Sequence, residues 1–116
     1  MDSYSIIDSL EWTDWLKFPN PKKGEYLYAP LGSGVYQLRL KSGKLILFGK
    51  GKNLAYRMSS LLPAPLGAGT RNNEEKRNYV KEHLEEIEYR TLATNLEKAS
   101  EIESEFKQLK IHKFNT

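Results

Sequence analysis

Two charged side chains, Glu103 and Arg57, fall on helix faces that the surrounding sequence makes apolar. Glu103 lies four residues after Ala99 and three before Phe106, which is the spacing of one helix face. Arg57 lies three residues after Leu54 in a shorter apolar segment. A buried carboxylate without a partner is costly, so such a group normally meets a cation, a metal ion or water. Two interpretations follow. Either the two side chains form a buried ion pair or reach past the edge of the core, or they line a cleft in which the carboxylate holds a divalent metal and the arginine holds a phosphate.

One stretch of the chain carries several cations with no carboxylate to balance them. Residues 34–57 contain six Lys or Arg and no carboxylate, whereas residues 82–105 contain eight Glu against two cations. This asymmetry is typical of a protein with one face for a polyanion, although a charged run can also be ordinary solvated surface. If the polyanion is a nucleic acid, the residues best suited to contact its phosphates are Lys22, Lys23, Lys44, Lys50, Lys52, Arg71, Lys76 and Arg77.

The strands that must position these residues can be predicted from runs of aliphatic, aromatic and β-branched residues. Residues 35–40 and 45–48 predict a hairpin with a glycine-containing turn, and residues 87–92 predict a third strand. We therefore expect an α/β (α+β) domain with a small three-stranded, mainly antiparallel sheet flanked by helices.

Helices are predicted from apolar residues at helical spacing and from capping residues. The spacing is loosely helical over residues 5–18 and clearer over 73–86, and Asn53 is a plausible cap for a short helix over 54–62. For the last helix, Thr94 and Glu97 form the pattern of a capping box, with Thr94 as the N-cap.

The composition places the chain in a broad class. At 116 residues with 39% hydrophobic residues, we expect one domain with a real core rather than a disordered chain. The chain has no cysteine, which excludes disulfides and thiolate metal sites and fits a reducing compartment. It has no apolar run near the roughly 20 residues that span a bilayer, and its first residues lack the basic region of a signal peptide. We expect a cytoplasmic protein with no membrane partner.

Four short motifs, in order, resemble the GIY-YIG nuclease family. Gly34-Val35-Tyr36 stands where GIY marks the first hairpin strand, and Leu47-Phe48-Gly49 stands where YIG marks the second. Asn53-Leu54-Ala55-Tyr56-Arg57 matches N-L-x-x-R at the start of the first helix. Ala99 and Glu103 match A-x-x-x-E on the last helix. The resemblance thus selects the same arginine and glutamate that helix geometry singles out.

The resemblance implies divalent-metal-dependent hydrolysis of DNA phosphodiester bonds. It implies that Glu103 is the sole protein ligand of Mg²⁺ or Mn²⁺ and that Arg57 clamps the phosphate. It implies that Tyr36 orients or deprotonates the attacking water, and that Asn115, at the position of a frequent closing asparagine, supports the site by hydrogen bonding. A Tyr36 packed in the core is the alternative for that side chain.

The second motif departs from the family at one position. Leu47 stands where the family has its second tyrosine, so proton transfer requires another group or is lost. Lys50, counted among the catalytic candidates, or Lys52 could supply a cation that lowers the pKa of Tyr36. Tyr56, Tyr79 and His83 are weaker substitutes. Two further readings stay open: a catalytically inert DNA-binding or interaction module with the same fold, and a basic domain with no nucleic-acid role.

The resemblance divides the chain in two. It predicts a GIY-YIG-like domain over residues 32–116, preceded by a helical or loop extension over residues 1–31 whose two tryptophans pack against the sheet. The predicted domain has no room for an appended DNA-targeting domain, so a homodimer or a partner protein is expected to supply specificity.

Overall fold

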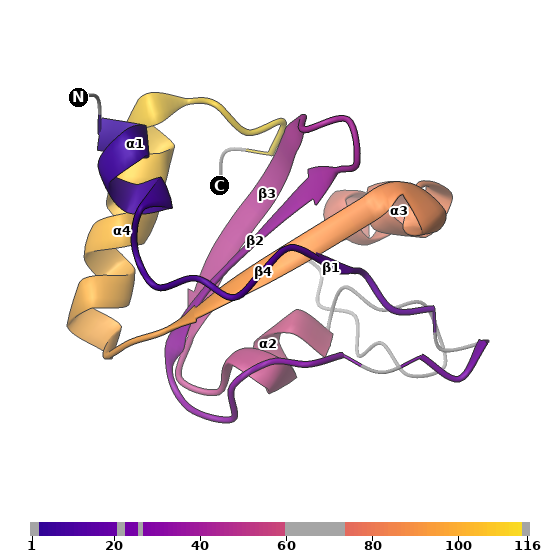
Figure 1. Cartoon of the computed structure of the whole chain (residues 1–116), viewed down its shortest axis with the longest axis horizontal. Helices are drawn as coiled ribbons and strands as arrows, with labels where there is room; N and C mark the ends of the chain where they lie inside the picture. The colour runs from indigo at the N-terminus through magenta and orange to yellow at the C-terminus, as the bar shows by residue number, and fades with distance from the viewer. Residues whose placement is uncertain (1–2, 21–22, 26, 60–73, 115–116) are drawn as a thin grey trace.

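The computed structural model describes residues 3–20, 23–25, 27–59 and 74–114, and these fold as an α+β domain (Figure 1). Within them, one antiparallel sheet has the strand order β1-β4-β2-β3. The strands are β1 (Leu16–Lys17), β2 (Gly34–Leu40), β3 (Leu45–Gly51) and β4 (Ile87–Ala93). The predicted fold class is confirmed, with four strands in place of the expected three.

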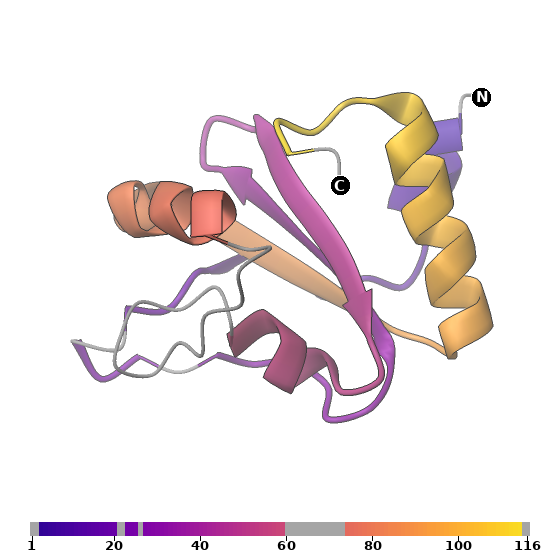
Figure 2. The same ribbon diagram turned by 180° about the vertical axis from the view of Figure 1, so that it is seen from behind.

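Helices cover both faces of this sheet (Figures 1 and 2). They are α1 (Ser3–Asp8), α2 (Leu54–Ser59), α3 (Glu74–Glu82), the 3₁₀ turn η3 (Leu84–Glu86) and α4 (Leu96–Leu109). α1 and α4 lie together on one side of the sheet, and α2 and α3 lie on the other. None of the helices in the described ranges is long and apolar enough to span a bilayer.

The alternation of side chains along the strands builds two separate cores. Tyr36 and Leu38 of β2 face the side of α2 and α3, where they join Leu54, Met58 and Val80. The opposite core consists of Val35, Phe48 and Leu92 from the strands, Ile7 from α1, and Ala99, Ile102 and Phe106 from α4. The central strand β2 therefore sends its motif tyrosine toward α2 and α3 and its neighbouring residues toward α4.

The N-terminal helix is much shorter than its spacing predicts. α1 ends at Asp8, and the chain then runs extended to β1. On the way, Thr13 N donates to Thr91 O of β4 at 2.9 Å. The Trp12 and Trp15 rings lie against the Arg90 guanidinium, at 4.3 and 4.6 Å from its central carbon. The free backbone edge of β4 and this cation–π contact favour the extended form over a weak helical periodicity. The expected packing of both tryptophans on the sheet is confirmed.

The last helix begins one residue later than the capping-box pattern predicts. Asn95 is the N-cap, and its side-chain oxygen accepts from Lys98 N at 2.7 Å. Thr94 is instead held to the β2 side of the domain, because Ser33 Oγ donates to Thr94 O at 2.6 Å. The predicted hairpin, third strand and Asn53 cap are confirmed, the last by a bond from Tyr56 N to Asn53 Oδ1 at 3.1 Å.

Candidate active site

Tyr36 lies in the middle of the sheet, with its phenol laid across the neighbouring strand. It pairs with Gly49 of β3, and a β-carbon built on Gly49 would overlap the hydroxyl end of the Tyr36 ring. The glycine of the second motif is therefore required by the tyrosine of the first. Burial is the main cause that raises the pKa of Tyr36 to about 12, with Glu103 also raising it, while the charge of Arg57 and a hydrogen bond from it act the other way.

Arg57 reaches the site from α2, which starts directly after β3. The Asn53 cap sets the start of this helix, and Gly51 allows the turn between strand and helix to be tight. A β-carbon on Gly51 would come within 3.1 Å of Arg57 Cβ, so the stem of the arginine lies against the end of β3. Its positive charge, and to a smaller extent hydrogen bonding, act on the phenol of Tyr36 in the direction that lowers the pKa of that phenol.

Glu103 enters from the other side, on α4. Its side chain is half-buried at 21% exposed, and Oε1 lies 3.6 Å from Lys107 Nζ and 3.9 Å from Lys50 Nζ. Lys50 also donates to Ser100 Oγ at 2.8 Å, which ties the end of β3 to α4. Glu103 is thus neither an apolar-stripe residue in the core nor fully exposed. It lies at the edge of the core among cations.

A fourth element, α3, brings Lys76 to the same place. Lys76 is half-buried, and burial is the main cause that lowers the pKa of its ammonium. The charges of Arg57 and Lys107 lower that pKa further, and Glu103 opposes them. These charges act on Lys76, and those of Arg57 and Glu103 act on Tyr36 as well, so α2, α3 and α4 each bring a charged group within electrostatic range of the site. Lysines and arginine outnumber the single carboxylate, so the arrangement favours an anionic ligand.

The sequence predicts a role for Lys76 but not for Lys107. Lys76 was expected only as a phosphate contact on the surface, and nothing in its spacing indicates that α3 carries it toward Glu103. Lys107 was missed, although it stands four residues after Glu103 on one helix, a spacing that predicts an ion pair.

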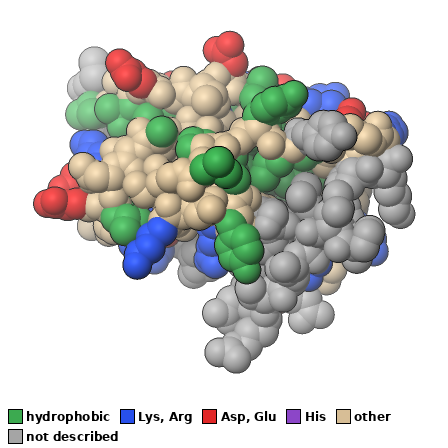
Figure 3. All heavy atoms as spheres, turned by 90° about the horizontal axis from the view of Figure 1, so that it is seen from below, with side chains coloured by type: hydrophobic (Ala, Val, Ile, Leu, Met, Phe, Trp, Pro, Cys, Tyr) green, Lys and Arg blue, Asp and Glu red, His purple; other side chains and the backbone are tan. Residues whose placement is uncertain are grey.

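The remaining predicted phosphate contacts are spread more widely. Lys44 is exposed in the turn at the opposite end of the hairpin from Gly51, and Lys52 is exposed just beyond β3. Arg77 is half-buried on α3. Lys23 forms an ion pair with Glu85 at 2.9 Å, which ties its charge to an acidic neighbour. Figure 3, seen from below, shows Lys and Arg side chains beside hydrophobic ones, with carboxylates only toward the edges.

Several predicted site residues fall outside the described ranges: Asn115, Arg71 and Lys22. Leu47, where the resembled family has a tyrosine, is fully buried in the core with Leu38, its partner across the hairpin. That position carries no polar group toward the site. Tyr56 is 73% exposed, and Tyr79 stacks on His83 at 4.1 Å between ring centroids. Tyr56 therefore lies largely in solvent, and Tyr79 and His83 pack against each other.

Sequence reasoning also missed a line of polar side chains through the α4 face. Asp8 Oδ1 lies 2.8 Å from Arg90 Nη2, Arg90 Nε donates to Gln37 Oε1 at 2.8 Å, and the Gln37 amide nitrogen lies 2.9 Å from His112 Nε2. Gln37, Arg90 and His112 are all buried. The four residues are far apart in the sequence and have no shared pattern, so only the fold brings them together.

The donor set tests whether a metal ion fits the site. In the described part of the chain, no three His, Cys, Asp or Glu side chains form a metal-binding cluster. Glu103 is a lone carboxylate, which suits Mg²⁺ or Mn²⁺ only where water and a substrate phosphate supply most of the ligands. A cation held there would take the place of the two lysine contacts at Oε1. The residues present fit a weakly held ion that arrives with a phosphate.

No family model, curated protein or solved structure matches this chain in the comparisons made with each.

Proposed function

We propose that this domain is a divalent-metal-dependent endonuclease that hydrolyses DNA phosphodiester bonds, similar in its site to the GIY-YIG nucleases. The observation that carries the proposal is the convergence of Tyr36, Arg57 and Glu103, from three different elements, at a place where cations predominate. These are the residues that the sequence motifs select. A site with several cations and one half-buried carboxylate suits a phosphodiester held together with a divalent ion.

Each side chain takes a role that follows from its surroundings. Glu103 holds Mg²⁺ or Mn²⁺, which when bound withdraws charge from the phosphate and the leaving oxygen. Arg57 and Lys76 hold the phosphate oxygens and stabilise the charge that grows on them as water attacks phosphorus and the bond to the leaving oxygen breaks. Lys107 and Lys50, which contact Glu103 Oε1, would add to this positive field if a metal ion took their place at that oxygen.

Tyr36 acts as a neutral hydrogen-bonding group rather than as a stored base. Because burial raises its pKa to about 12, the phenol keeps its proton at neutral pH. Its hydroxyl, beside Arg57 and packed on Gly49, orients the attacking water, which gives its proton to solvent and not to the phenol. Lys44, Lys52 and Arg77 contact the DNA backbone on either side and position it without reading sequence. We further propose that the protein acts in the cytoplasm, and that a second copy or a partner supplies specificity.

The test is nicking of supercoiled plasmid with Mg²⁺ or Mn²⁺, compared with the same reaction in EDTA. Glu103→Ala and Arg57→Ala should each slow nicking by about 100-fold or more, because each removes a charge that acts on the transition state. Glu101→Ala is the matched control, since Glu101 lies on the same helix but is exposed. Full nicking by Glu103→Ala and Arg57→Ala would refute the site. So would an equal loss in all three variants.

One observation favours a second candidate function, a DNA-binding module without catalysis. Leu47 is fully buried, so the site lacks the second phenol of the resembled family, and the first has a raised pKa. This candidate predicts DNA binding that weakens steeply with salt, and no turnover with either metal. Binding without nicking at every metal concentration would select it over the nuclease.

A further inference from the structure

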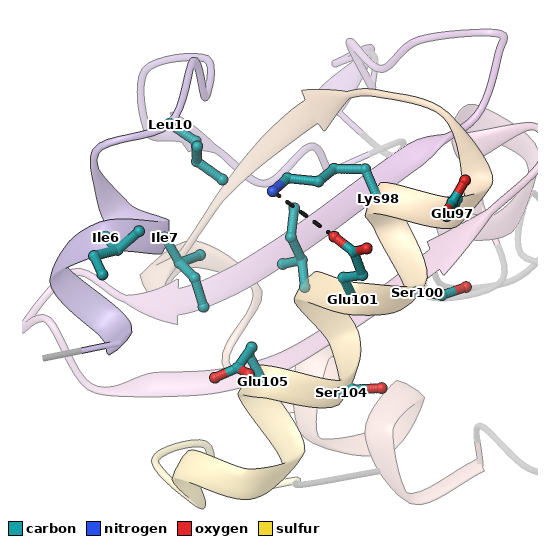
Figure 4. Close-up of a pocket in the computed structure, with 10 residues that line it drawn as sticks. Ile6, Ile7, Leu10, Glu97, Lys98, Ser100, Glu101, Ser104 and Glu105 are labelled. Atoms are coloured by element: carbon teal, nitrogen blue, oxygen red, sulfur yellow. Dashed lines mark ion pairs between the residues drawn. The ribbon is translucent and has the colours of Figure 1, made fainter.

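A groove of about 860 Å³ runs between α1 and α4, and its floor is apolar (Figure 4). Ile6 and Ile7 of α1, Leu10 beyond it, and Ile102 of α4 line this floor. Ile7 and Ile102 are buried in the core beneath, whereas Ile6 is 55% exposed. Figure 4 shows side chains of α1 and α4 facing each other across the groove. The apolar surface that the groove offers to solvent therefore comes mainly from Ile6 and the half-buried Leu10.

The α4 side of the groove is acidic. Glu97, Glu101 and Glu105 follow one another at every fourth position, against one cation, Lys98. Among the described residues, only Glu101 of these three is in an ion pair, with Lys98 Nζ at 3.9 Å. Like charges four residues apart destabilise a helix by a few tenths of a kcal/mol per pair. Within the described chain, the pair with Lys98 and the place of Glu97 in the first turn of α4 offset part of this cost, and Glu105 has no ion pair there.

This groove is separate from the candidate active site. Successive residues of a helix turn by about 100°, so Glu103 projects from α4 some 200° away from Glu101. Glu103 faces Lys50 and Lys107, and Glu101 faces the groove with Lys98. A ligand seated in the groove would leave the cationic site on the opposite flank of α4 open.

We propose that this groove docks an amphipathic helix of a partner protein that carries Lys or Arg beside its apolar stripe. A helix laid between α1 and α4 would bury Ile6 and Leu10 under its apolar face. Its flanking cations would meet the row of glutamates, which gives the partner its charge requirement. The proposal does not depend on nuclease activity.

Charge complementarity selects this occupant over two others. A second copy docked through the same groove about a two-fold axis would set the acidic stripe of one chain against that of its partner, and like charges there oppose association. DNA or RNA would bring phosphates against the same carboxylates. A basic helix satisfies both the apolar floor and the acidic rim.

The test uses a designed amphipathic peptide of about 18 residues, with Leu along one face and Lys and Arg on either side of it. A second peptide keeps the same Leu face and carries Glu in place of the cations. Binding to the full chain is measured by fluorescence anisotropy, and the footprint by amide chemical shifts. The variant is Glu101→Lys/Glu105→Lys. Its control, Glu82→Lys/Glu86→Lys, makes the same charge change at exposed positions outside the groove.

We expect the basic peptide to bind and the acidic one to bind at least about tenfold more weakly. The groove variant should weaken the basic peptide by about fivefold or more, with the control within twofold, because each lost exposed pair accounts for up to about a fivefold effect. Shifts should map to α1 and to residues 97–105.

Four outcomes of the peptide experiment would overturn the proposal: equal binding of both peptides, equal effects of variant and control, shifts that map to the flank of Glu103, or no saturable binding up to about 1 mM peptide. A concentration-dependent dimer that Ile6→Asp dissociates would also overturn it, in favour of a second copy.

Discussion

The pH dependence of stability should report the buried environment of His112. Arg90 Nε donates to Gln37 Oε1, so the amide nitrogen of Gln37 is left to donate to His112 Nε2 at 2.9 Å. His112 therefore accepts at Nε2 and carries its proton on Nδ1, which is buried without a partner in the described structure. Protonation at Nε2 would place two donors face to face and add a charge beside the Arg90 guanidinium.

The size of the effect follows from the two protonation equilibria. Burial chiefly, and the charge of Arg90 second, lowers the pKa of His112 from 6.5 to about 4. Between those values the unfolded chain binds a proton that the folded chain does not, so stability rises with pH across this window. The contribution of neutral His112 to the free energy of unfolding is fully present above about pH 6.5 and is lost as the pH falls to about 4. A shift of about 2.5 pKa units, at about 1.4 kcal/mol each, gives on the order of 3 kcal/mol.

Urea unfolding of the natural chain and of His112→Gln, over about pH 4 to 7.5, measures this contribution. The glutamine keeps an acceptor for Gln37 but does not titrate. Carboxylates titrate in both chains, so they cancel in the difference between the two free energies of unfolding. The free energy of unfolding of the natural chain minus that of the variant should fall by on the order of 3 kcal/mol from the neutral end to the acidic end. Parallel profiles for the two chains, or an NMR titration of His112 with a midpoint near 6.5, would refute the reasoning.

Two further substitutions test how the candidate site and its helix are built. Gly49→Ala should lower the free energy of unfolding by about 1–3 kcal/mol and alter the near-ultraviolet signal of tyrosine, because the new methyl group would overlap Tyr36. The control is Gly32→Ala, since a β-carbon at Gly32 meets nothing within 4 Å. Equal losses of stability at both positions would contradict this account. Asn95→Ala should cost about 1 kcal/mol in urea unfolding because it removes the cap of α4, with Thr94→Ala costing less. A larger loss of stability from Thr94→Ala than from Asn95→Ala would instead identify Thr94 as the N-cap.

Local patterns were reliable where the physical cause is local. The hairpin, the third strand and the Asn53 cap follow from strand-forming runs, turn residues and side-chain capping, and the structure has them close to the predicted bounds. The cap of α4 was misplaced by one residue because Thr94 and Asn95 are both good caps. The choice between them rests on Ser33, which holds Thr94 from 61 residues away.

The N-terminal segment shows the opposite case. Its weak helical spacing ends at Asp8, because the edge of β4 and the Arg90 guanidinium offer residues 12–17 hydrogen bonds and cation–π contacts that a helix would forgo. Neither partner can be identified from the segment itself. A short apolar run has no fixed preference, and tertiary contacts then decide its conformation.

For the candidate site, the sequence by itself determined which residues have the chemistry: a motif tyrosine, an arginine and a glutamate at positions where helix geometry makes a charge unusual. It also determined that Leu47 breaks the pattern. Only the tertiary structure decided what surrounds them. Electrostatics depends on distance and burial, and these come from how α2, α3 and α4 pack on the sheet. That packing sets Lys107 and Lys50 on Glu103, brings Lys76 into range, and buries Tyr36 until its pKa leaves the range of a base at neutral pH.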